Sequence, residues 1–247
     1  MNVRGKTAIV IGGSRGLGQG VVKALAESSV SVTSVSRGAA ALTDELGIMH
    51  RAGDVVDEAL AKNLIAETEP DIVVVSAGAV PAMSPINAID WEGFSKIWNS
   101  DVRGTLVWIQ ATLAAPLKPG SRVLLMSSGA AINGSPFSGG YAGAKRMIWL
   151  MADYAQKWSV RQKMGVTFQT IIPRQMIGNT GVGDAGAAAY SQDQRISKEE
   201  FLAGFGNALP PLDFGRHVVS ILEKEEFLAS RAFAINGDAG IVAIEAA

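Results

Sequence analysis

A tyrosine and a lysine four residues apart are the side chains of this sequence with the clearest potential for chemistry. Tyr141 and Lys145 stand at positions i and i+4, so a helix places both on one face. A nearby ammonium group favours the phenolate and lowers the pKa of a tyrosine from its free value of about 10. The phenol then becomes a usable proton donor or acceptor near neutral pH. Ser128 follows a short apolar run and could hold a carbonyl oxygen through its hydroxyl.

A glycine-rich segment near the N-terminus could hold the phosphates of a nucleotide. It reads Gly12-Gly13-Ser14-Arg15-Gly16-Leu17-Gly18. Glycines allow a tight turn and a close backbone approach, and a helix N-terminus offers free N–H groups to a pyrophosphate. Glycine-rich turns between a strand and a helix also arise for steric reasons alone. The position of this one, directly after the first predicted strand, favours a dinucleotide site.

The end of the second predicted strand indicates which nicotinamide dinucleotide is preferred. An NAD site usually has an acid about 20 residues after the glycine motif, where it accepts a hydrogen bond from the ribose 2′-hydroxyl. This chain has Ser36 and Arg37 there, and Arg15 of the glycine loop could face the same spot. Two guanidinium groups and a hydroxyl suit a 2′-phosphate. We therefore expect NADP(H); NAD(H) is the alternative if both arginines are solvated surface charges.

Two later strand ends are expected to complete the nucleotide site. Asp54 and Val55 follow the third predicted strand, where the carboxylate could accept a hydrogen bond from the adenine amino group or cap the next helix. Ser76-Ala77-Gly78 follows the fourth predicted strand. Its small residues let the backbone pass close to a cofactor, although a simple turn explains them too.

These side chains need a scaffold, and the sequence alternates short apolar runs with longer amphipathic ones. We predict strands over Thr7–Ile11, Val30–Ser36, Ile48–Ala52, Asp71–Val75, Arg122–Met126, Val166–Ile172 and Ala232–Ile235. We predict helices over Gly16–Ser28, Ala39–Glu45, Asp57–Glu67, Trp91–Ala114, Ser138–Trp158 and Leu212–Leu222. The alternation predicts an α/β fold with a doubly wound parallel sheet and helices on both faces. No linker-like segment divides the chain, so residues 1–247 are expected to form a single domain.

Residues 178–207 break this pattern, because they are rich in Gly and Ala and have weak periodicity. A floppy surface loop is one interpretation. A substrate lid is the other, and it is favoured because long loops in compact domains are often functional. Met83, Ile86, Phe137 and Met176 hint at a partly hydrophobic substrate pocket, although each could be ordinary packing.

Composition excludes several classes of protein. Lys+Arg is 22 and Asp+Glu is 23, so the net charge of −1 argues against nucleic-acid binding through a basic face and against a polybasic membrane-surface protein. The chain has no Cys and two His, His50 and His217, so no metal site is expected. No signal peptide or spanning apolar run is visible, and we expect a soluble cytoplasmic protein.

With these motifs, the sequence resembles the short-chain dehydrogenase/reductase family in its single-domain type, from Lys6 to Gly240. The resemblance rests on the glycine loop, Asp54, Ser76-Ala77-Gly78, Ser128, Tyr141-Ala142-Gly143-Ala144-Lys145 and the Pro173 segment. It implies a Rossmann fold with a seven-stranded parallel sheet. It also implies cofactor contacts from Pro173, Met176 and Thr180, in addition to those of the residues named above.

The resemblance further implies a role for each catalytic residue. Tyr141 would exchange the proton with the substrate oxygen, Lys145 would bind the nicotinamide ribose, and Ser128 would position the substrate oxygen. The activity would be hydride transfer between NADP(H) and a small carbonyl or secondary alcohol substrate. Two alternatives stay open: a non-catalytic nucleotide-binding redox sensor, and a non-redox lyase or epimerase on the same fold.

The chain departs from the family pattern at four places. Ile11 replaces a threonine before the glycine loop, and Ser76 replaces an asparagine after the fourth strand. Asp101 stands where the family has the asparagine of its catalytic tetrad, and we expect it to keep the role of ordering water beside Lys145. The usual Pro-Gly is Pro173-Arg174, so Arg174 could face the substrate pocket or be solvated.

Family resemblance also implies a homodimer or homotetramer, built through the helices predicted over Trp91–Ala114 and Ser138–Trp158. Trp108, Trp149 and Met151 lie on these helices. They are compatible with an exposed apolar interface, and equally with the core of the subunit.

Overall fold

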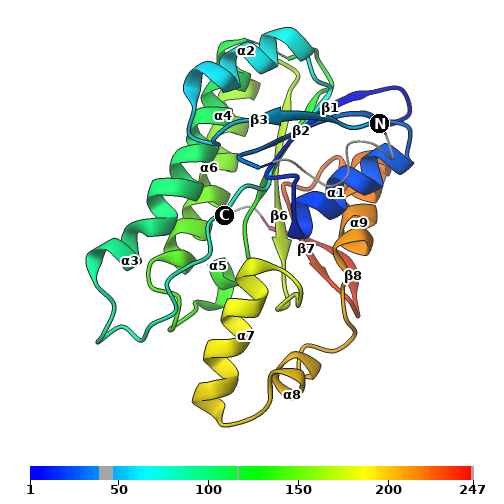
Figure 1. Ribbon diagram of the computed structural model, residues 1–247. Helices are drawn as coiled ribbons and strands as arrows, with labels where there is room; N and C mark the ends of the chain where they lie inside the picture. The colour runs from blue at the N-terminus through cyan, green and yellow to red at the C-terminus, as the bar shows by residue number, and fades with distance from the viewer. Residues whose placement is uncertain (39–46, 116, 246–247) are drawn as a thin grey trace.

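The computed structural model describes residues 1–38, 47–115 and 117–245 of the chain. The helix predicted over Ala39–Glu45 lies outside these residues. The described strands form one eight-stranded sheet in the order β3-β2-β1-β4-β5-β6-β7-β8 (Figure 1). Their bounds are β1 Thr7–Ile11, β2 Ser31–Ser36, β3 Met49–Ala52, β4 Ile72–Val75, β5 Arg122–Met126, β6 Thr167–Pro173, β7 Ala232–Asn236 and β8 Gly240–Ile244.

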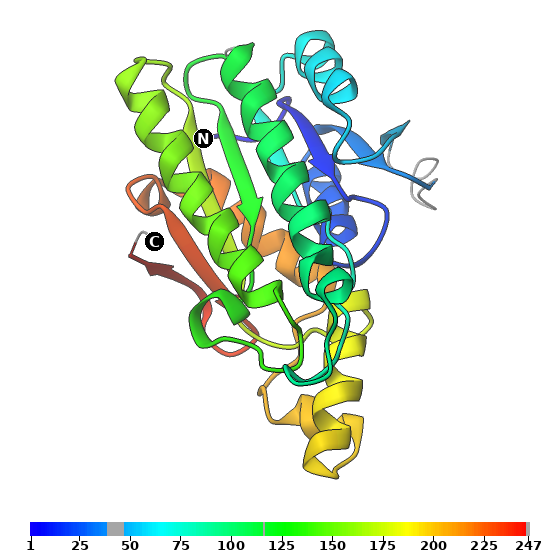
Figure 2. The ribbon, with the colours of Figure 1, turned by 90° about the vertical axis from the view of Figure 1, so that its left-hand side faces the viewer.

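Helices cover both faces of this sheet. Their bounds are α1 Gly16–Glu27, α2 Glu58–Thr68, α3 Trp91–Ile97, α4 Arg103–Ala114, α5 Ala130–Asn133, α6 Tyr141–Arg161, α7 Gly181–Gln194, α8 Lys198–Ala203 and α9 Pro211–Glu223. A π-helical turn, Trp98–Val102, joins α3 to α4, and a short 3-10 turn, Glu225–Phe227, follows α9. Figures 1 and 2 show α1 and α9 on one face and α2, α4 and α6 on the other. This is the α/β Rossmann-like architecture that the alternation predicts.

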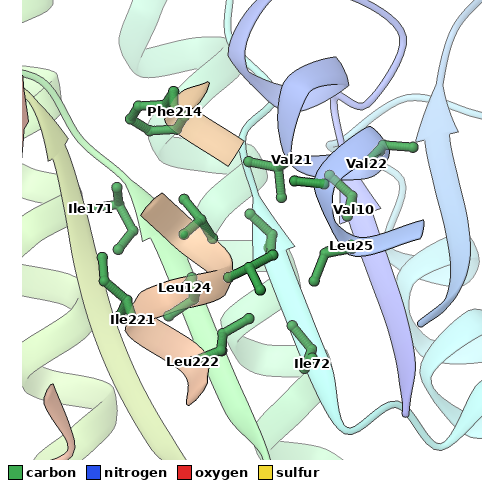
Figure 3. Packing of buried hydrophobic residues seen from close by; sticks show 14 of the residues in the cluster. Val10, Val21, Val22, Leu25, Ile72, Leu124, Ile171, Phe214, Ile221 and Leu222 are labelled. Carbon is green, nitrogen blue, oxygen red and sulfur yellow. The ribbon is translucent and has the colours of Figure 1, made fainter. Parts of the chain in front are cut away.

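The central strands are buried on both faces because neighbouring side chains point to opposite sides of the sheet. Along β1, Ala8 and Val10 pack under α1 and α9, whereas Ile9 and Ile11 pack under the helices of the other face. Figure 3 shows Val10 in the first of these layers, together with Leu25 of α1 and Phe214 of α9. The sheet is therefore a stiff central layer that fixes the positions of its strand ends.

The seven predicted strands are confirmed, and all of them pair in parallel. The sheet has an eighth strand that was not predicted, β8, which runs antiparallel to β7. The turn before it is held by Asn236, whose side-chain oxygen accepts hydrogen bonds from the backbone N–H groups of Asp238 and Ala239. An antiparallel edge strand of this kind adds to the parallel sheet without changing the carboxyl-end edge where a site would lie.

One further expectation needs correction, and the structure narrows two questions that the sequence left open. The helix predicted over Trp91–Ala114 is interrupted by the π-helical turn, and residues 178–207 contain α7 and α8 rather than an unstructured loop. Trp108, Trp149 and Met151 are buried in the subunit, so they belong to its packing and not to an exposed face. Among the described residues, we find no helix with the length and apolar content needed to cross a membrane.

The end of α9 is held by a buried cation. Arg122, on β5, is 1% exposed, and its guanidinium donates hydrogen bonds to the Gln169 side-chain oxygen and to the carbonyl oxygens of Ile221 and Leu222. Burial lowers the pKa of Arg122 to about 10, assisted by repulsion from Arg231, so the group stays charged at neutral pH. A positive charge at the C-terminal end of a helix stabilises the helix, because it interacts favourably with the negative end of the helix dipole.

Candidate active site

A cavity of about 850 Å³ opens at the carboxyl ends of the parallel strands. Its walls come from the segments that follow β1 to β6, and from α7 and α8 beyond them. All the predicted site residues line it: Gly12, Ser14, Arg15, Gly16, Leu17, Gly18, Ser36, Arg37, Asp54, Val55, Ser76, Ala77, Gly78, Asp101, Ser128, Tyr141, Lys145, Pro173, Met176 and Thr180. The fold thus brings motifs from most of the chain to one place.

The glycine loop is shaped for close contact between backbones. Gly12 has φ +86°, and a Cβ atom there would lie 2.5 Å from the backbone of Ala77. A Cβ atom on Gly18 would collide with the carbonyl oxygen of Gly12. The N-terminus of α1 has no side-chain cap from Arg15 and no acidic residue in its first turn. Its backbone N–H groups and the positive end of its dipole are therefore available to an anion, and the loop fits a dinucleotide pyrophosphate.

Arg15 and Arg37 both line the cavity, and they follow the neighbouring strands β1 and β2. Within the described residues, neither guanidinium forms a hydrogen bond or an ion pair. The Ser36 hydroxyl, by contrast, is engaged: it donates to the carbonyl oxygen of Gly38 at 2.6 Å and lies 3.0 Å from Nε2 of His50. The two arginines are thus the groups here with free donors for a phosphate, and Ser36 with His50 shapes the turn that carries Arg37. The sequence interpretation missed His50.

The sequence left open whether Asp54 caps the next helix or faces the nucleotide, and in the structure the capping residue is Asp57. Asp57 caps α2, since its carboxylate accepts a hydrogen bond from the backbone N–H of Leu60 at 3.0 Å. Asp54 instead accepts from the N–H of Val56 at 3.2 Å and lines the cavity. Asp54 therefore keeps a carboxylate on the cavity wall, and its contact with an adenine amino group stays a prediction.

Tyr141 and Lys145 lie at the start of α6, on the face turned toward β5. Both are buried, and the Lys145 Nζ atom lies 5.6 Å from the centroid of the Tyr141 ring. Lys145 also donates to the carbonyl oxygen of Met126, at the end of β5, at 3.4 Å. The helix register therefore produces the predicted arrangement of a phenol and an ammonium side by side.

Asp101 makes a direct ion pair with this lysine. Its Oδ2 atom lies 2.9 Å from Lys145 Nζ, and its Oδ1 atom accepts hydrogen bonds from the Ala79 N–H at 2.9 Å and the Ser100 hydroxyl at 2.7 Å. Asp101 sits in the π-helical turn, a feature often found at functional sites. Gly78 makes room for it, since a Cβ atom there would lie 2.9 Å from Oδ2. Sequence reasoning expected Asp101 to order water beside Lys145 and to alter, through its charge, the coupling between Tyr141 and Lys145. It did not foresee the direct ion pair.

The charge of Lys145 depends on this contact. Burial by itself lowers the pKa of the ammonium group, because it removes the solvating water. The negative charges of Asp101 and of an ionised Tyr141, with the hydrogen bond to Asp101, outweigh burial and raise the pKa of Lys145 above its ordinary value. The cavity therefore contains a lysine that is fully charged at neutral pH.

The two serines that end β5 have different partners. The Ser127 hydroxyl donates to the carbonyl oxygen of Lys145 at 2.7 Å and so joins β5 to α6. The Ser128 hydroxyl accepts a hydrogen bond from the Ala130 N–H at 3.2 Å, and its own proton is free to be donated. This supports Ser128, rather than Ser127, as the group that meets a substrate oxygen.

The segment over residues 178–207, which was predicted to be a lid, contributes aromatic residues that the sequence interpretation missed. Tyr190 of α7, Phe201 of α8 and Phe205 line the cavity, as do Met83 and Met176. Ile86 and Phe137, which were also suggested as pocket residues, do not line it. Arg174 lines it but is exposed. The aromatic residues carry no motif spacing, so only the folded segment brings them together.

The two ends of this segment are tied at neighbouring points. The Gln175 side chain donates to the carbonyl oxygen of Asn207 at 3.1 Å and accepts from the Gly237 N–H at 2.5 Å. The Asn207 N–H donates to the Asp238 carboxylate at 3.0 Å. Residues 176–206 thus form a closed excursion that leaves the sheet edge and returns beside its point of departure, as α7 and α8 do in Figure 1.

In the described part of the chain, no group of three or more His, Cys, Asp or Glu side chains is placed where it could hold a metal ion.

Comparison with known proteins gives consistent matches. A family model described as short chain dehydrogenase matches residues 6–184. The chain is 27% identical to a hydroxynaphthalene reductase from Aspergillus fumigatus, over 88% of this chain and 85% of the relative. It is 29% identical to a sorbitol dehydrogenase from Cereibacter sphaeroides, over 87% of this chain and 86% of the relative.

Solved structures match over nearly the whole chain. A dehydrogenase/reductase from Sinorhizobium meliloti has a TM-score of 0.77 and 23% identity, covering 97% of this chain and 96% of its own. An actinorhodin polyketide ketoreductase solved with NADPH has a TM-score of 0.78 and 17% identity, covering 94% and 95%. At these identities the structures establish a shared fold.

Proposed function

Because this chain belongs to the short-chain dehydrogenase/reductase family, we propose that it is an NADP(H)-dependent oxidoreductase that interconverts a small carbonyl compound and its secondary alcohol. The observation that carries the proposal is the cluster of Tyr141, Lys145 and Ser128 in the same cavity as the glycine loop. A nucleotide-holding scaffold would need the loop but not the proton-transfer groups.

The cofactor would be held by the chain's own donors. The loop from Gly12 to Gly18 and the first turn of α1 would take the pyrophosphate, and Asp54 would accept from the adenine amino group. Arg15 and Arg37 would take the 2′-phosphate in the planar, forked geometry that guanidinium groups favour. When bound, the nicotinamide supplies the hydride for carbonyl reduction and receives it in alcohol oxidation.

Protein groups would handle the proton. In the direction of reduction, Ser128 donates a hydrogen bond to the carbonyl oxygen, and Tyr141 transfers its phenolic proton to that oxygen as negative charge develops there. The substrate oxygen becomes the hydroxyl of the alcohol product, and Tyr141 is left as a phenolate beside the Lys145 ammonium. In the direction of oxidation, the phenolate takes the same proton back.

Relatives support the reaction class without narrowing the substrate. One of them is named for reducing a hydroxynaphthalene and another for oxidising sorbitol, so a ring compound and an open-chain polyol occur among similar sequences. Both names describe the reduction or oxidation of a hydroxylated compound, which agrees with an oxidoreductase.

The test is NADPH oxidation against a panel of ketones, with Tyr141→Phe as the variant. Removing the phenolic hydroxyl should lower kcat/KM by about 100- to 10,000-fold, because it removes the proton donor. NADPH binding, followed by nucleotide fluorescence, should persist in the variant. Turnover by Tyr141→Phe equal to that of the wild type would refute the proposed donor, and binding without turnover of any ketone or alcohol would favour a nucleotide-holding scaffold.

A further inference from the structure

Beyond the groups assigned to the nucleotide and to proton transfer, the cavity has an end that lies under α7 and α8. Tyr190, Phe201 and Phe205 come to it from the lid segment, and Met83 and Met176 come from the segments after β4 and β6. Figures 1 and 2 show α7 and α8 standing beyond the carboxyl ends of the strands. This end is therefore the wall that a substrate meets when its carbonyl oxygen reaches Ser128 and Tyr141.

The aromatic rings of this wall pack in a continuous series. Tyr190 meets Phe137 edge to face at 5.2 Å between centroids, and it stacks on Phe201 at 5.8 Å with 3° between the planes. Phe201 meets Phe205 at 5.4 Å and 75°. These are the offset-stacked and edge-to-face arrangements that aromatic rings prefer. The rings are only partly buried, so the series still has apolar surface to offer.

The polar end of Tyr190 is already satisfied. Its hydroxyl shares a 2.8 Å hydrogen bond with the Ser135 hydroxyl, which belongs to the loop between α5 and α6. That contact fixes the plane of the ring and joins the lid to the loop that leads to Tyr141. Because its phenol is engaged there, Tyr190 offers the cavity an oriented aromatic surface rather than a free polar group.

Charged groups are placed away from this wall or are neutralised. Arg15, Arg37 and Asp54 border the nucleotide end, and Lys145 is paired with Asp101. Arg174 is exposed at the rim. A ligand part that is flat, uncharged and rich in π electrons is the one that such a surface binds best, since ring–ring contacts add to the burial of apolar area.

We propose that the substrate is an aryl ketone or the corresponding aryl carbinol, with its aromatic ring held against Tyr190 and Phe201, and that Tyr190 is the residue that selects for the ring. This inference rests on the proposed function, because it takes the cavity as the place where the ketone is reduced. It adds the chemical class of the group next to the carbonyl.

The test compares a matched pair of ketones that differ in aromaticity. Naphthyl methyl ketone and decalyl methyl ketone have the same carbon skeleton, one aromatic and one saturated. The measured quantity is the ratio of their kcat/KM values in each protein. Comparing this ratio between variants cancels the difference in intrinsic reactivity of the two ketones. In Tyr190→Leu the ratio should fall by about 2- to 10-fold, because the aryl substrate loses its ring partner.

Tyr190→Phe is the matched control. It keeps the ring but loses the hydroxyl that meets Ser135, so it should keep a ratio close to that of the wild type. An unchanged ratio in Tyr190→Leu, or an equal fall in both variants, would overturn the proposal. A fall in Tyr190→Phe alone would assign Tyr190 to holding the lid rather than to selecting a ring.

Binding without turnover separates this inference from the proposed function. Titration calorimetry of naphthyl methyl ketone and decalyl methyl ketone into the NADP⁺-loaded protein, where no hydride is available to reduce them, should show preference for the naphthyl ketone, and Tyr190→Leu should reduce it. If no ketone is turned over by any protein, the oxidoreductase proposal fails, and the calorimetric preference alone decides whether the wall selects aromatic rings. Equal affinity for both ketones in the wild type would contradict the inference.

Discussion

At the scale of single residues, the chain's main departure from its family is Asp101. The asparagine expected there is neutral, whereas Asp101 places a carboxylate 2.9 Å from the buried Lys145 ammonium. The raised pKa of Lys145 follows from that charge, set against the opposing effect of burial. By linkage, this pairing contributes stability that is fully present below the ordinary pKa of lysine and is lost as the pH rises through the pKa of the folded protein.

Asp101→Asn should therefore change the pH dependence of catalysis. The amide keeps an oxygen for the Ala79 N–H but removes the charge, so burial should then lower the pKa of Lys145. We expect the alkaline limb of the kcat/KM profile for carbonyl reduction to move to lower pH, with a smaller change at neutral pH. Steady-state rates from neutral to alkaline pH measure it. An alkaline limb that stays in place would show that the ion pair does not set the charge of Lys145 during turnover.

Arg37 is the second residue where a single charge carries a prediction. Arg37→Asp should lower the ratio of kcat/KM for NADPH over NADH by about 10- to 100-fold, since a charge-assisted contact of about 1.5–3 kcal/mol is replaced by repulsion. Arg51→Asp is the matched control, because Arg51 lies on the neighbouring strand and pairs with Glu67 outside the cavity. A cofactor ratio that is unaltered in Arg37→Asp, or altered equally in the control, would contradict the assignment.

At the scale of elements, two helix ends carry the architecture of the site. The start of α6 presents Tyr141 and Lys145, and the π-helical turn before α4 turns Asp101 toward them. The sequence predicted the first, because an i,i+4 pair after a strand is a local pattern. It did not predict the second, because a single π turn within a helix has no residue pattern of its own by which the sequence would mark it.

The C-terminal end of α9 depends on Arg122, which donates hydrogen bonds to two of its carbonyl oxygens. Arg122→Met should destabilise the fold by about 2–4 kcal/mol, since it leaves Gln169 and two helix carbonyl oxygens without their buried donor. Urea unfolding followed by circular dichroism measures the change. Arg216→Met, on the exposed side of the same helix, removes only surface ion pairs and should cost less than about 1 kcal/mol. Equal losses in the two variants would rule out a special role for the buried cation.

At the scale of the whole molecule, the parallel sheet with helices on both faces and the gathering of the motifs at its carboxyl edge follow from patterns visible in the sequence, whereas the surfaces do not. The glycine loop, Ser128 and the Tyr141–Lys145 pair were found by local spacing. The ring series of Tyr190 and Phe201 was not, because it forms only when two helices of a weakly periodic segment fold together. The sequence left open whether Trp108 lies in the core or on the surface. Helical spacing shows which residues share a helix face, but it does not show whether that face packs against the sheet or against solvent.

Assembly is a prediction at this scale. Trp98, Leu106, Tyr154, Trp158 and Val160 are exposed on α4, α6 and the adjoining π turn, and Figure 2 shows α4 and α6 side by side on one face. We expect this face to pair with the same face of a second copy, since two parallel ridges of apolar side chains suit a two-fold contact.

Trp158→Lys should therefore shift the mass measured by light scattering toward that of one chain. Leu228→Lys is the control, because Leu228 is an exposed apolar residue away from these helices, and this variant should leave the mass unchanged. A wild-type protein that already elutes as a single chain at micromolar concentration would refute the pairing.

The tie between Gln175, Asn207 and Gly237 has a consequence for how this molecule could diversify. Because the excursion over residues 176–206 begins and ends at one fastened point, its length and composition can change while the floor beneath it keeps its shape. New specificities could then be acquired by exchanging this one insert, while Ser128, Tyr141 and Lys145, which lie outside it, stay in place.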